Sequence, residues 1–140
     1  MERLNELYQS LDDCGVLFFE EKLPFSDALV IEVDGIYGLF TDHSQYQSLS
    51  EELVSIAHEC GHVFTGSLHN LDNRNKLVNQ DECRANRWAI KKLLPFGKIQ
   101  DALRLGYTTI YDLADYFNLT EAFVQMAVDY YIVARGLSFS

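Results

Sequence analysis

The chain is poor in basic residues. Of its 140 residues, 11 are lysine or arginine and 21 are aspartate or glutamate, which gives a formal net charge of -10 at pH 7. Nucleic-acid binding draws much of its affinity from basic side chains that neutralise phosphates, so this composition argues against direct binding to nucleic acid. A basic protein partner suits the charge better, because complementary charge speeds encounter. Acidity that serves only solubility is the alternative explanation.

The chain also lacks long apolar runs and an even set of cysteines. No apolar segment reaches the roughly 18 residues that span a bilayer, and no apolar stretch follows a basic region near Met1. We therefore expect neither a membrane segment nor a signal peptide. Three cysteines is an odd number, and reduced thiols in the cytoplasm are its simplest interpretation. A chain of this length suits one domain whose core forms without disulfides.

Residues 58–62 read His-Glu-Cys-Gly-His, which is the H-E-x-x-H pattern of zinc hydrolases. Residues four apart lie one above the other on a helix, so His58 and His62 can point both rings at one ion. A catalytic zinc site takes three protein ligands and leaves its fourth position to water. Glu59 can take a proton from that water and pass it to a leaving amine. The pattern predicts one Zn²⁺ per chain and Glu59 as the catalytic residue.

The flanking residues favour a helix around this motif. Ser48 and Glu51 form a possible capping box at its start, and Gly66 is a natural stop at its end. Gly61 inside the helix costs about 1 kcal/mol relative to alanine. A small residue beside the metal would let another segment approach closely, which would explain why glycine stands there.

The third ligand distinguishes between classes of zinc enzyme. A metzincin has glycine three residues and histidine six residues after the second histidine of the motif, but Gly66 and His69 each come one place too late. We therefore favour Glu82, which lies in a second helical segment and would complete a thermolysin-like His2Glu site. Asn86 follows one turn later and could accept a hydrogen bond from His58, which would fix its tautomer.

A structural role for Glu82 is the alternative. Asn79 could cap this second helix, which would put Glu82 at the third position of a capping box. Caps are far commoner than metal sites, but the upstream H-E-x-x-H motif reverses the preference. We predict Glu82 to be a metal ligand.

Two blocks of the chain together resemble the ImmA/IrrE-type metallopeptidases. Residues 57–62 read A-H-E-C-G-H, close to that family's A-H-E-x-G-H, and residues 82–89 match its E-x-x-A-N-x-F/W-A block. The segment 34–40 is similar to the short strand region before the family's active-site helix. The resemblance implies that His58, His62 and Glu82 bind the metal and that Glu59 is catalytic. It also implies a helix-turn-helix repressor of a phage or mobile element as the protein substrate.

The chain departs from the family pattern at two cysteines. Cys60 stands where the family usually has an aliphatic residue, and Cys83 adjoins the glutamate of the second block. Either thiol could approach the metal or be oxidised. Tyr46 and His69 are further candidates, for stabilising the transition state, but a plain structural contact is the favoured interpretation for each.

The remaining segments indicate the architecture. Leu4, Leu7 and Leu11 lie at helical spacing in residues 2–12, and the runs 16–19, 29–33 and 36–40 are rich in strand formers. Asp34-Gly35 is typical of a hairpin turn. We expect a small antiparallel β-sheet of about three strands packed on the motif helix, and a polar connector over residues 67–78.

The C-terminal third is expected to be helical. Residues 98–105 suggest a short helix, and Thr120 can cap another that runs to about Ala134. The segment 112–117, followed by residues 118–120 and this Thr120-capped helix, resembles half of a helix-turn-helix. Four acidic residues crowd it, so a packing or substrate-docking role is favoured over DNA reading: Asp112, Asp115, Glu121 and Asp129.

We predict a single gluzincin-like α+β domain over residues 1–140. Its zincin-like core spans residues 1–95 and its helical subdomain residues 96–140. The predicted function is a zinc-dependent endopeptidase that acts on a protein substrate. The alternatives are a repressor-binding module with structural zinc, in which Cys60 or Cys83 supplies a fourth ligand, and a metal-dependent sensor or transcription regulator. The oligomeric state is left open.

Overall fold

The computed structural model of this chain describes residues 2–66 and 76–139. Helices and a small sheet follow one another in an α+β arrangement, which confirms the predicted fold class. In chain order the elements are α1 (Glu2–Asp13), β1 (Leu17–Glu20), β2 (Ala28–Val33), β3 (Ile36–Thr41), the short 3₁₀ helix η1 (His43–Gln45), α2 (Leu49–Thr65), α3 (Lys76–Leu93), α4 (Phe96–Arg104), α5 (Ile110–Phe117), α6 (Glu121–Asp129) and the π-helical turn η2 (Tyr130–Ala134).

The sheet has the strand order β1-β3-β2 and is mixed. Strands β2 and β3 form the predicted hairpin, in which Asp34 and Gly35 adopt φ values of 52° and 80°. Strand β1 pairs with β3 in parallel, so the expectation of a purely antiparallel sheet was wrong. Alternation along a strand indicates which residues are buried, but it does not indicate which strand lies beside which. Here β3 is inserted between two strands that precede it in the chain.

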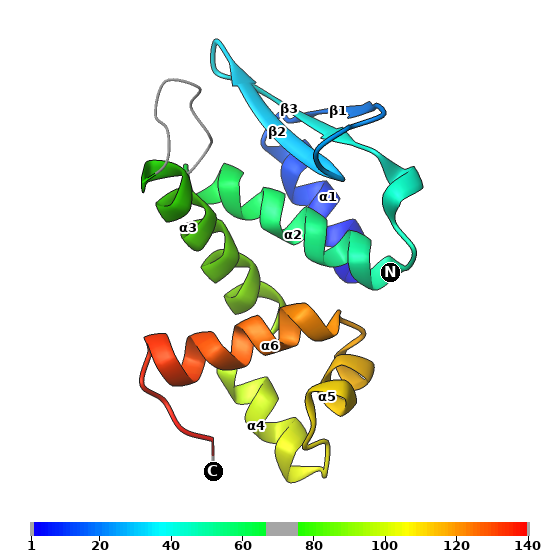
Figure 1. Ribbon diagram of the computed structural model, residues 1–140. Coiled ribbons are helices and arrows are strands. Elements are labelled where there is room, and N and C mark those ends of the chain that lie inside the picture. The colour runs from blue at the N-terminus through cyan, green and yellow to red at the C-terminus, as the bar shows by residue number, and fades with distance from the viewer. Residues whose placement is uncertain (1, 67–75, 140) are drawn as a thin grey trace.

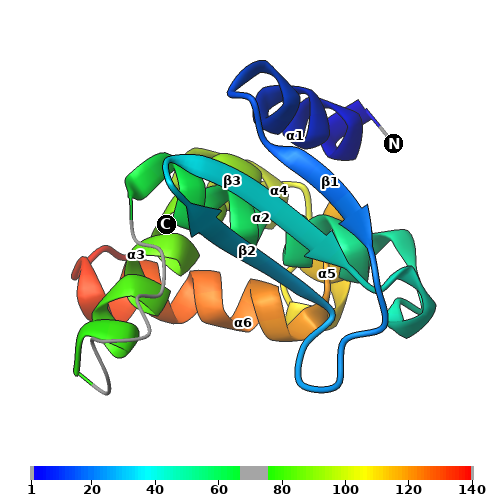
Figure 2. The ribbon, with the colours of Figure 1, turned by 90° about the horizontal axis from the view of Figure 1, so that it is seen from above.

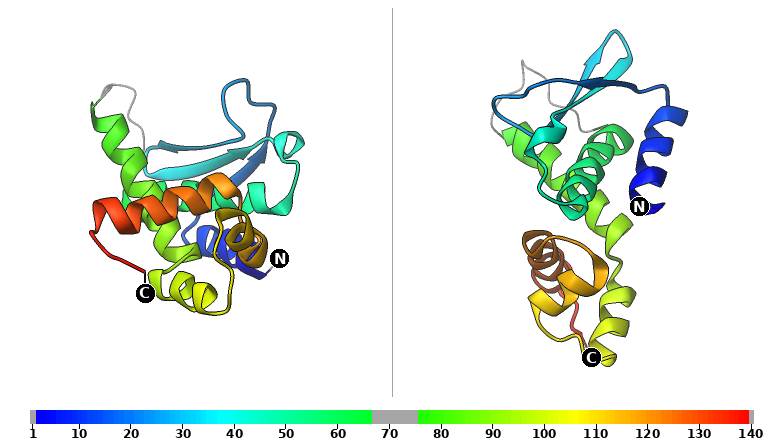
Figure 3. Two further views of the ribbon diagram at one scale, coloured as in Figure 1. Left: turned by 60° about the horizontal axis from the view of Figure 1, so that its bottom comes forward. Right: turned by 90° about the vertical axis from the view of Figure 1, so that its right-hand side faces the viewer.

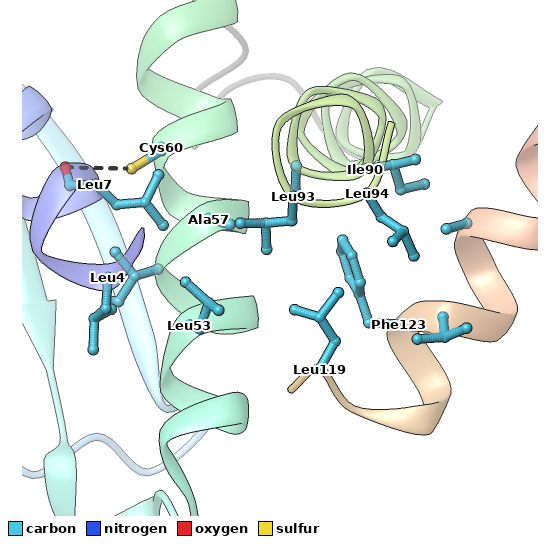
Figure 4. Close-up of a cluster of buried hydrophobic side chains, with 14 of the residues drawn as sticks. Leu4, Leu7, Leu53, Ala57, Cys60, Ile90, Leu93, Leu94, Leu119 and Phe123 are labelled. Carbon is cyan, nitrogen blue, oxygen red and sulfur yellow. Dashed lines mark hydrogen bonds between the residues drawn. The ribbon is translucent and has the colours of Figure 1, made fainter. Parts of the chain in front are cut away.

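The sheet lies over α2, and α1 and α3 flank that helix (Figures 1 and 2). Val30 and Leu39 point from the sheet into the core, and both are buried. From the side of α1, Leu4, Leu7 and Leu11 are buried as their spacing predicted. Figure 4 shows α2 between two parts of the core, with Leu7 on one side of it and Leu93 on the other. The motif helix is thus held on several sides.

The C-terminal helices pack at the far end of α3 (Figure 3). Thr109 caps α5 and Thr120 caps α6, and each hydroxyl accepts a hydrogen bond from the third residue along. Helix α4 begins at Phe96, two residues before the predicted start, with Pro95 at its N-cap position. The Tyr131 hydroxyl donates to the Leu94 carbonyl at 2.9 Å, which ties η2 to the end of α3.

Helix α3 begins earlier than the sequence suggested. Its first residue is Lys76, so residues 76–78 of the predicted connector are helical, and residues 67–75 lie outside the described part of the chain. Asn79 therefore lies inside the helix and does not cap it, which removes the structural alternative for Glu82. Among the described helices, none is both long and apolar enough to cross a membrane.

Helices α2 and α3 pack backbone against backbone at Gly61. A Cβ atom on Gly61 would lie 2.4 Å from the Ala85 carbonyl oxygen and 2.7 Å from the Ala85 Cα. Real Cβ atoms do not come so close to backbone, so any larger residue would push the two helices apart. This contact accounts for a glycine inside α2, as the sequence had suggested.

We predict that Gly61→Ala destabilises the metal-free protein. Overpacking against backbone costs about 1–3 kcal/mol, which outweighs the gain of about 1 kcal/mol in helix propensity. Urea unfolding followed by circular dichroism measures the change. Gly97→Ala in α4 is the matched control, because a Cβ there meets nothing within 4 Å. Equal stability of the two variants would contradict the close contact.

Asp42 organises the segment between β1 and β2. Its carboxylate accepts hydrogen bonds from the Leu23 N–H at 3.1 Å, the Gln45 side-chain amide at 3.0 Å and the Ser44 N–H at 3.2 Å. The same Gln45 amide donates to the carbonyls of Leu23 and Ser26 at 2.9 Å. These hydrogen bonds, first among them those from Gln45 and Ser44, hold the pKa of Asp42 well below its usual range.

We predict that Asp42→Asn lowers stability at neutral pH and that the loss shrinks in acid. A carboxylate with a depressed folded-state pKa stabilises the fold above its unfolded pKa of about 3.9 and loses that contribution as pH falls further. Urea midpoints of the two proteins between pH 7 and pH 3 give the comparison. A constant difference across this range would show that the carboxylate charge is irrelevant.

Candidate metal centre

Local signals at both ends of α2 fix its position in the chain. The Ser48 side chain accepts from the Glu51 N–H at 3.2 Å, and Gly66 ends the helix in the left-handed conformation at φ 68°. The Glu51 carboxylate accepts in turn from the Gln47 N–H. The predicted capping box is thus present, with its return bond made one residue before the cap. These interactions place residues 58–62 in the last two turns of a regular helix.

The structure brings His58, His62 and Glu82 together, with one ligand atom from each within 4.8 Å of the others. The two histidine Nε2 atoms lie 3.1 Å apart. The Glu82 carboxylate oxygens lie 2.8 Å from Nε2 of His58 and 3.0 Å from Nε2 of His62. Ligands at about 2.05 Å around a tetrahedral zinc stand roughly 3.3 Å from one another. The three groups therefore have a spacing that suits a single ion.

Asn86 orients the first of these histidines. Its side-chain oxygen lies 2.7 Å from Nδ1 of His58. An amide oxygen only accepts, so Nδ1 must donate and Nε2 keeps its lone pair. That lone pair faces His62 and Glu82, which is the arrangement that a metal ligand needs. The structure places Asn86 in the position that the sequence suggested.

Glu59 lies beside the three groups and is buried. Its Oε2 accepts a hydrogen bond from the Val30 N–H of β2 at 3.2 Å. Burial raises the pKa of Glu59 from 4.5 to about 8, and the nearby Glu82 charge adds to the rise. The hydrogen bond from Val30 opposes this shift. A carboxylate with such a pKa can exchange a proton near neutral pH.

A cleft of about 610 Å³ opens beside these residues. Helices α2, α3 and α6 and strand β2 contribute to its walls, and Phe123 and Met126 add an apolar side. Four carboxylates line it, from Asp27, Glu51, Glu59 and Glu82, and among the described residues no lysine or arginine does. The cleft is therefore open, partly apolar and negatively charged.

Cys60 and Cys83, the two departures from the family pattern, are not among the residues that converge with His58, His62 and Glu82. Cys60 is buried on the other side of α2, where its thiol points to the Leu7 carbonyl at 3.9 Å (Figure 4). Burial raises the pKa of this thiol to about 12, which disfavours thiolate. Cys83 is exposed, and it is not among the residues that converge at the site. In the described part of the chain, neither cysteine serves as a fourth ligand.

Tyr46 and His69 are the two residues that the sequence suggested for stabilising the transition state. The Tyr46 hydroxyl donates to Ser55 Oγ at 2.9 Å, and Tyr46 does not line the cleft. His69 lies outside the described residues.

Sequence reasoning missed Asp27 and Val30, which reach the site from the segment before β2 and from β2 itself, and it missed Ser55 of α2. Ser55 Oγ donates to Asp27 Oδ1 at 3.1 Å, and both residues line the cleft. Ser55 lies one turn before His58 and Glu59, so helical spacing could have singled it out. Val30 contributes through its backbone N–H, which no side-chain pattern signals.

A family model described as Peptidase_M78, IrrE N-terminal-like domain, matches residues 38–129. The chain belongs to this family. The match includes the whole of α2 and α3 and reaches the end of α6, so it covers His58, His62, Glu82 and the helical walls of the cleft but not the wall that β2 contributes. It begins within β3 and leaves α1, β1 and β2 outside. Searches of curated proteins and of solved structures find no match.

We predict that Asn86→Ala weakens zinc binding by about 10–100-fold, because loss of the acceptor frees the His58 ring and its tautomer. Competition with a chromophoric chelator measures the affinity. Asn86→Asp is the matched control, since it keeps an acceptor at the same place and should retain tight binding. Zinc affinity in the alanine variant equal to that of the wild type would show that Asn86 does not orient the ligand.

Proposed function

We propose that this protein is a zinc-dependent endopeptidase that cleaves a helix-turn-helix repressor of a phage or mobile element. One observation carries the proposal: His58, His62 and Glu82 converge on one point with the buried Glu59 beside them, at the side of an open cleft. Membership of a peptidase family supports hydrolysis as the reaction.

The donor set favours zinc. Two imidazole nitrogens and one carboxylate oxygen suit this ion, and three protein ligands are typical of its catalytic sites. When bound, zinc acidifies a water molecule and polarises the scissile carbonyl. His58, His62 and Glu82 would hold it, and Asn86 would keep His58 in the binding tautomer.

Glu59 supplies the proton chemistry. Its carboxylate takes a proton from the attacking water, and the raised pKa lets the side chain hold that proton near neutral pH. The protonated side chain then donates to the leaving amine. The N–H of Val30 anchors Oε2 of Glu59 throughout, which restricts the carboxyl group to one orientation.

Substrate binding is assigned to the cleft between β2 and α6. Strand β2 is an edge strand of the sheet, and its residues Ala28 and Leu29 line the cleft. An extended peptide can lie along such an edge, with its side chains in pockets of the neighbouring helices. Residues Phe123 and Met126 of α6 offer one apolar pocket.

The charge of the cleft supports a basic substrate. The carboxylates of Asp27 and Glu51 line it in addition to those at the metal-binding group. DNA-binding proteins carry lysine and arginine clusters that contact phosphates. A segment of such a protein would enter this cleft with favourable electrostatics, and the overall charge of -10 would speed the encounter.

A non-catalytic module with structural zinc is the competing function. Structural zinc sites are closed by four protein ligands. In the described residues three groups converge, and the thiols that could have closed the site lie elsewhere. This arrangement supports catalysis over sequestration.

We predict that Glu59→Gln keeps zinc and lowers the cleavage rate by about 10²–10⁴-fold, because the amide cannot take the proton. Zinc content by atomic absorption and fragment yield by gel electrophoresis measure the two effects. Glu51→Gln is the control: it changes another carboxylate of the cleft and keeps its capping ability. Unchanged cleavage by Glu59→Gln would exclude the proposed mechanism.

The substrate is tested by incubating the zinc-loaded protein with candidate repressors and identifying fragments by mass spectrometry. We expect a specific fragment pair that the Glu59→Gln variant does not produce. Tight complexes without fragments, across several repressors, would instead favour sequestration.

A further inference from the structure

The outer face of the sheet is apolar at every position. Because Val30 and Leu39 are buried on the inner face, strand alternation points their neighbours outward. Large side chains on that face are strongly exposed, with fractions of 51 % for Leu17, 42 % for Ile31, 64 % for Val33 and 58 % for Ile36. Antiparallel and mixed sheets with one solvated face normally alternate apolar and polar residues, but here no polar side chain interrupts the outer positions.

Two aromatic rings give this face a fixed surface. Phe19 of β1 and Phe40 of β3 stack with centroids 4.9 Å apart. Gly38 lies beside them, and a Cβ there would come within 3.3 Å of both rings. The missing side chain thus lets the rings lie flat over the strand. We call the exposed side chains of Leu17, Phe19, Ile31, Val33 and Ile36 the outer patch.

No described element of this chain covers the outer patch. In Figure 2 the sheet lies uppermost and the helices α2 to α6 lie beneath it, while α1 stands beside β1. The cleft and Glu59 are reached from the edge and inner side of β2. The patch is therefore separate from the candidate active site, and its role does not depend on catalysis. Contiguous exposed apolar surface of this kind marks interaction sites.

The charges around the outer patch indicate what covers it. Residues 16–41 carry five carboxylates and one basic residue, Lys22. That ammonium is already engaged, since it donates to Ser44 Oγ at 2.9 Å and lies 3.9 Å from Asp42. Asp34 is exposed at the hairpin turn and Glu21 is exposed beyond β1, so both lie at the ends of the outer patch. The other three carboxylates face elsewhere: Glu32 alternates to the inner side opposite Tyr37, Glu20 accepts from the His43 N–H, and Asp27 lines the cleft. The patch thus has an acidic rim.

We propose that the outer patch docks a protein partner that presents an apolar surface flanked by lysine or arginine. The apolar side chains of the outer patch would form the centre of the interface. The acidic rim would favour a partner whose apolar surface is surrounded by basic residues. A second copy of this chain fits poorly, because a face-to-face dimer would bring two acidic rims together between molecules that each carry -10.

The test uses two model partners and three proteins. The partners are fluorescent amphipathic helical peptides of about 20 residues with the same leucine face, one flanked by lysine and the other by glutamate. The first protein is the Glu59→Gln variant, which leaves the peptides uncleaved. The second adds Ile31→Thr and Ile36→Thr to that variant. The third adds Leu105→Thr and Val133→Thr to it instead. Leu105, at the C-cap of α4, and Val133, in η2, are exposed at 67 % and 80 %. This second pair of changes therefore controls for loss of apolar surface elsewhere. Circular dichroism verifies folding.

We expect the lysine-flanked peptide to bind at least about tenfold more tightly than the glutamate-flanked one at about 0.05 M salt. This difference in affinity should become smaller when the salt concentration is raised to about 0.5 M. The Ile31→Thr and Ile36→Thr changes should weaken binding of the lysine-flanked peptide by about tenfold, and the control pair should not. Equal loss in both variants, or no binding, would overturn the proposal. Sedimentation velocity adds one further outcome: self-association that the Ile31→Thr and Ile36→Thr changes abolish would assign the patch to a second copy instead.

Discussion

The close crossing of α2 and α3 at Gly61 is the contact on which the candidate site depends. Gly61 lies between the two histidines of its helix, and Ala85 lies between Glu82 and Asn86 on the other. Backbone contact at this pair sets the distance at which carboxylate and imidazole face each other. Any side chain larger than hydrogen at position 61 would separate the helices and open the group of ligands. One glycine thus links helix packing to the chemistry of the site.

Burial gives the site its second property. The sheet covers α2, so Glu59 is removed from water and placed within reach of a backbone N–H of β2. Low solvent access and the neighbouring Glu82 both disfavour the ionised form, which brings the pKa of Glu59 close to neutrality. The same sheet presents a wholly apolar outer face. The inner face shapes the candidate site, and the outer face is the one that we propose as a surface for contact.

Much of this could be predicted from the sequence. The caps at Ser48 and Thr120, the hairpin turn at Asp34 and the buried leucines of α1 each depend on neighbours a few residues away. The two histidines share a face because four residues make about one helical turn. Even Glu82, twenty residues later, was singled out, since a two-histidine site needs a third ligand and a helical segment with suitable residues follows.

The sequence by itself determined the features that short-range geometry controls. These are the helices, their caps, the hairpin turn, and the spacing of the residues that converge at the candidate site. Only the tertiary structure decided that β3 lies between β1 and β2, that Cys60 points to α1 and away from the metal group, and that Val30 bonds to Glu59. The physical reason is the same for all three. Each depends on contacts between residues distant in the chain, whose pairing is selected by the packing of the whole core and not by any local pattern.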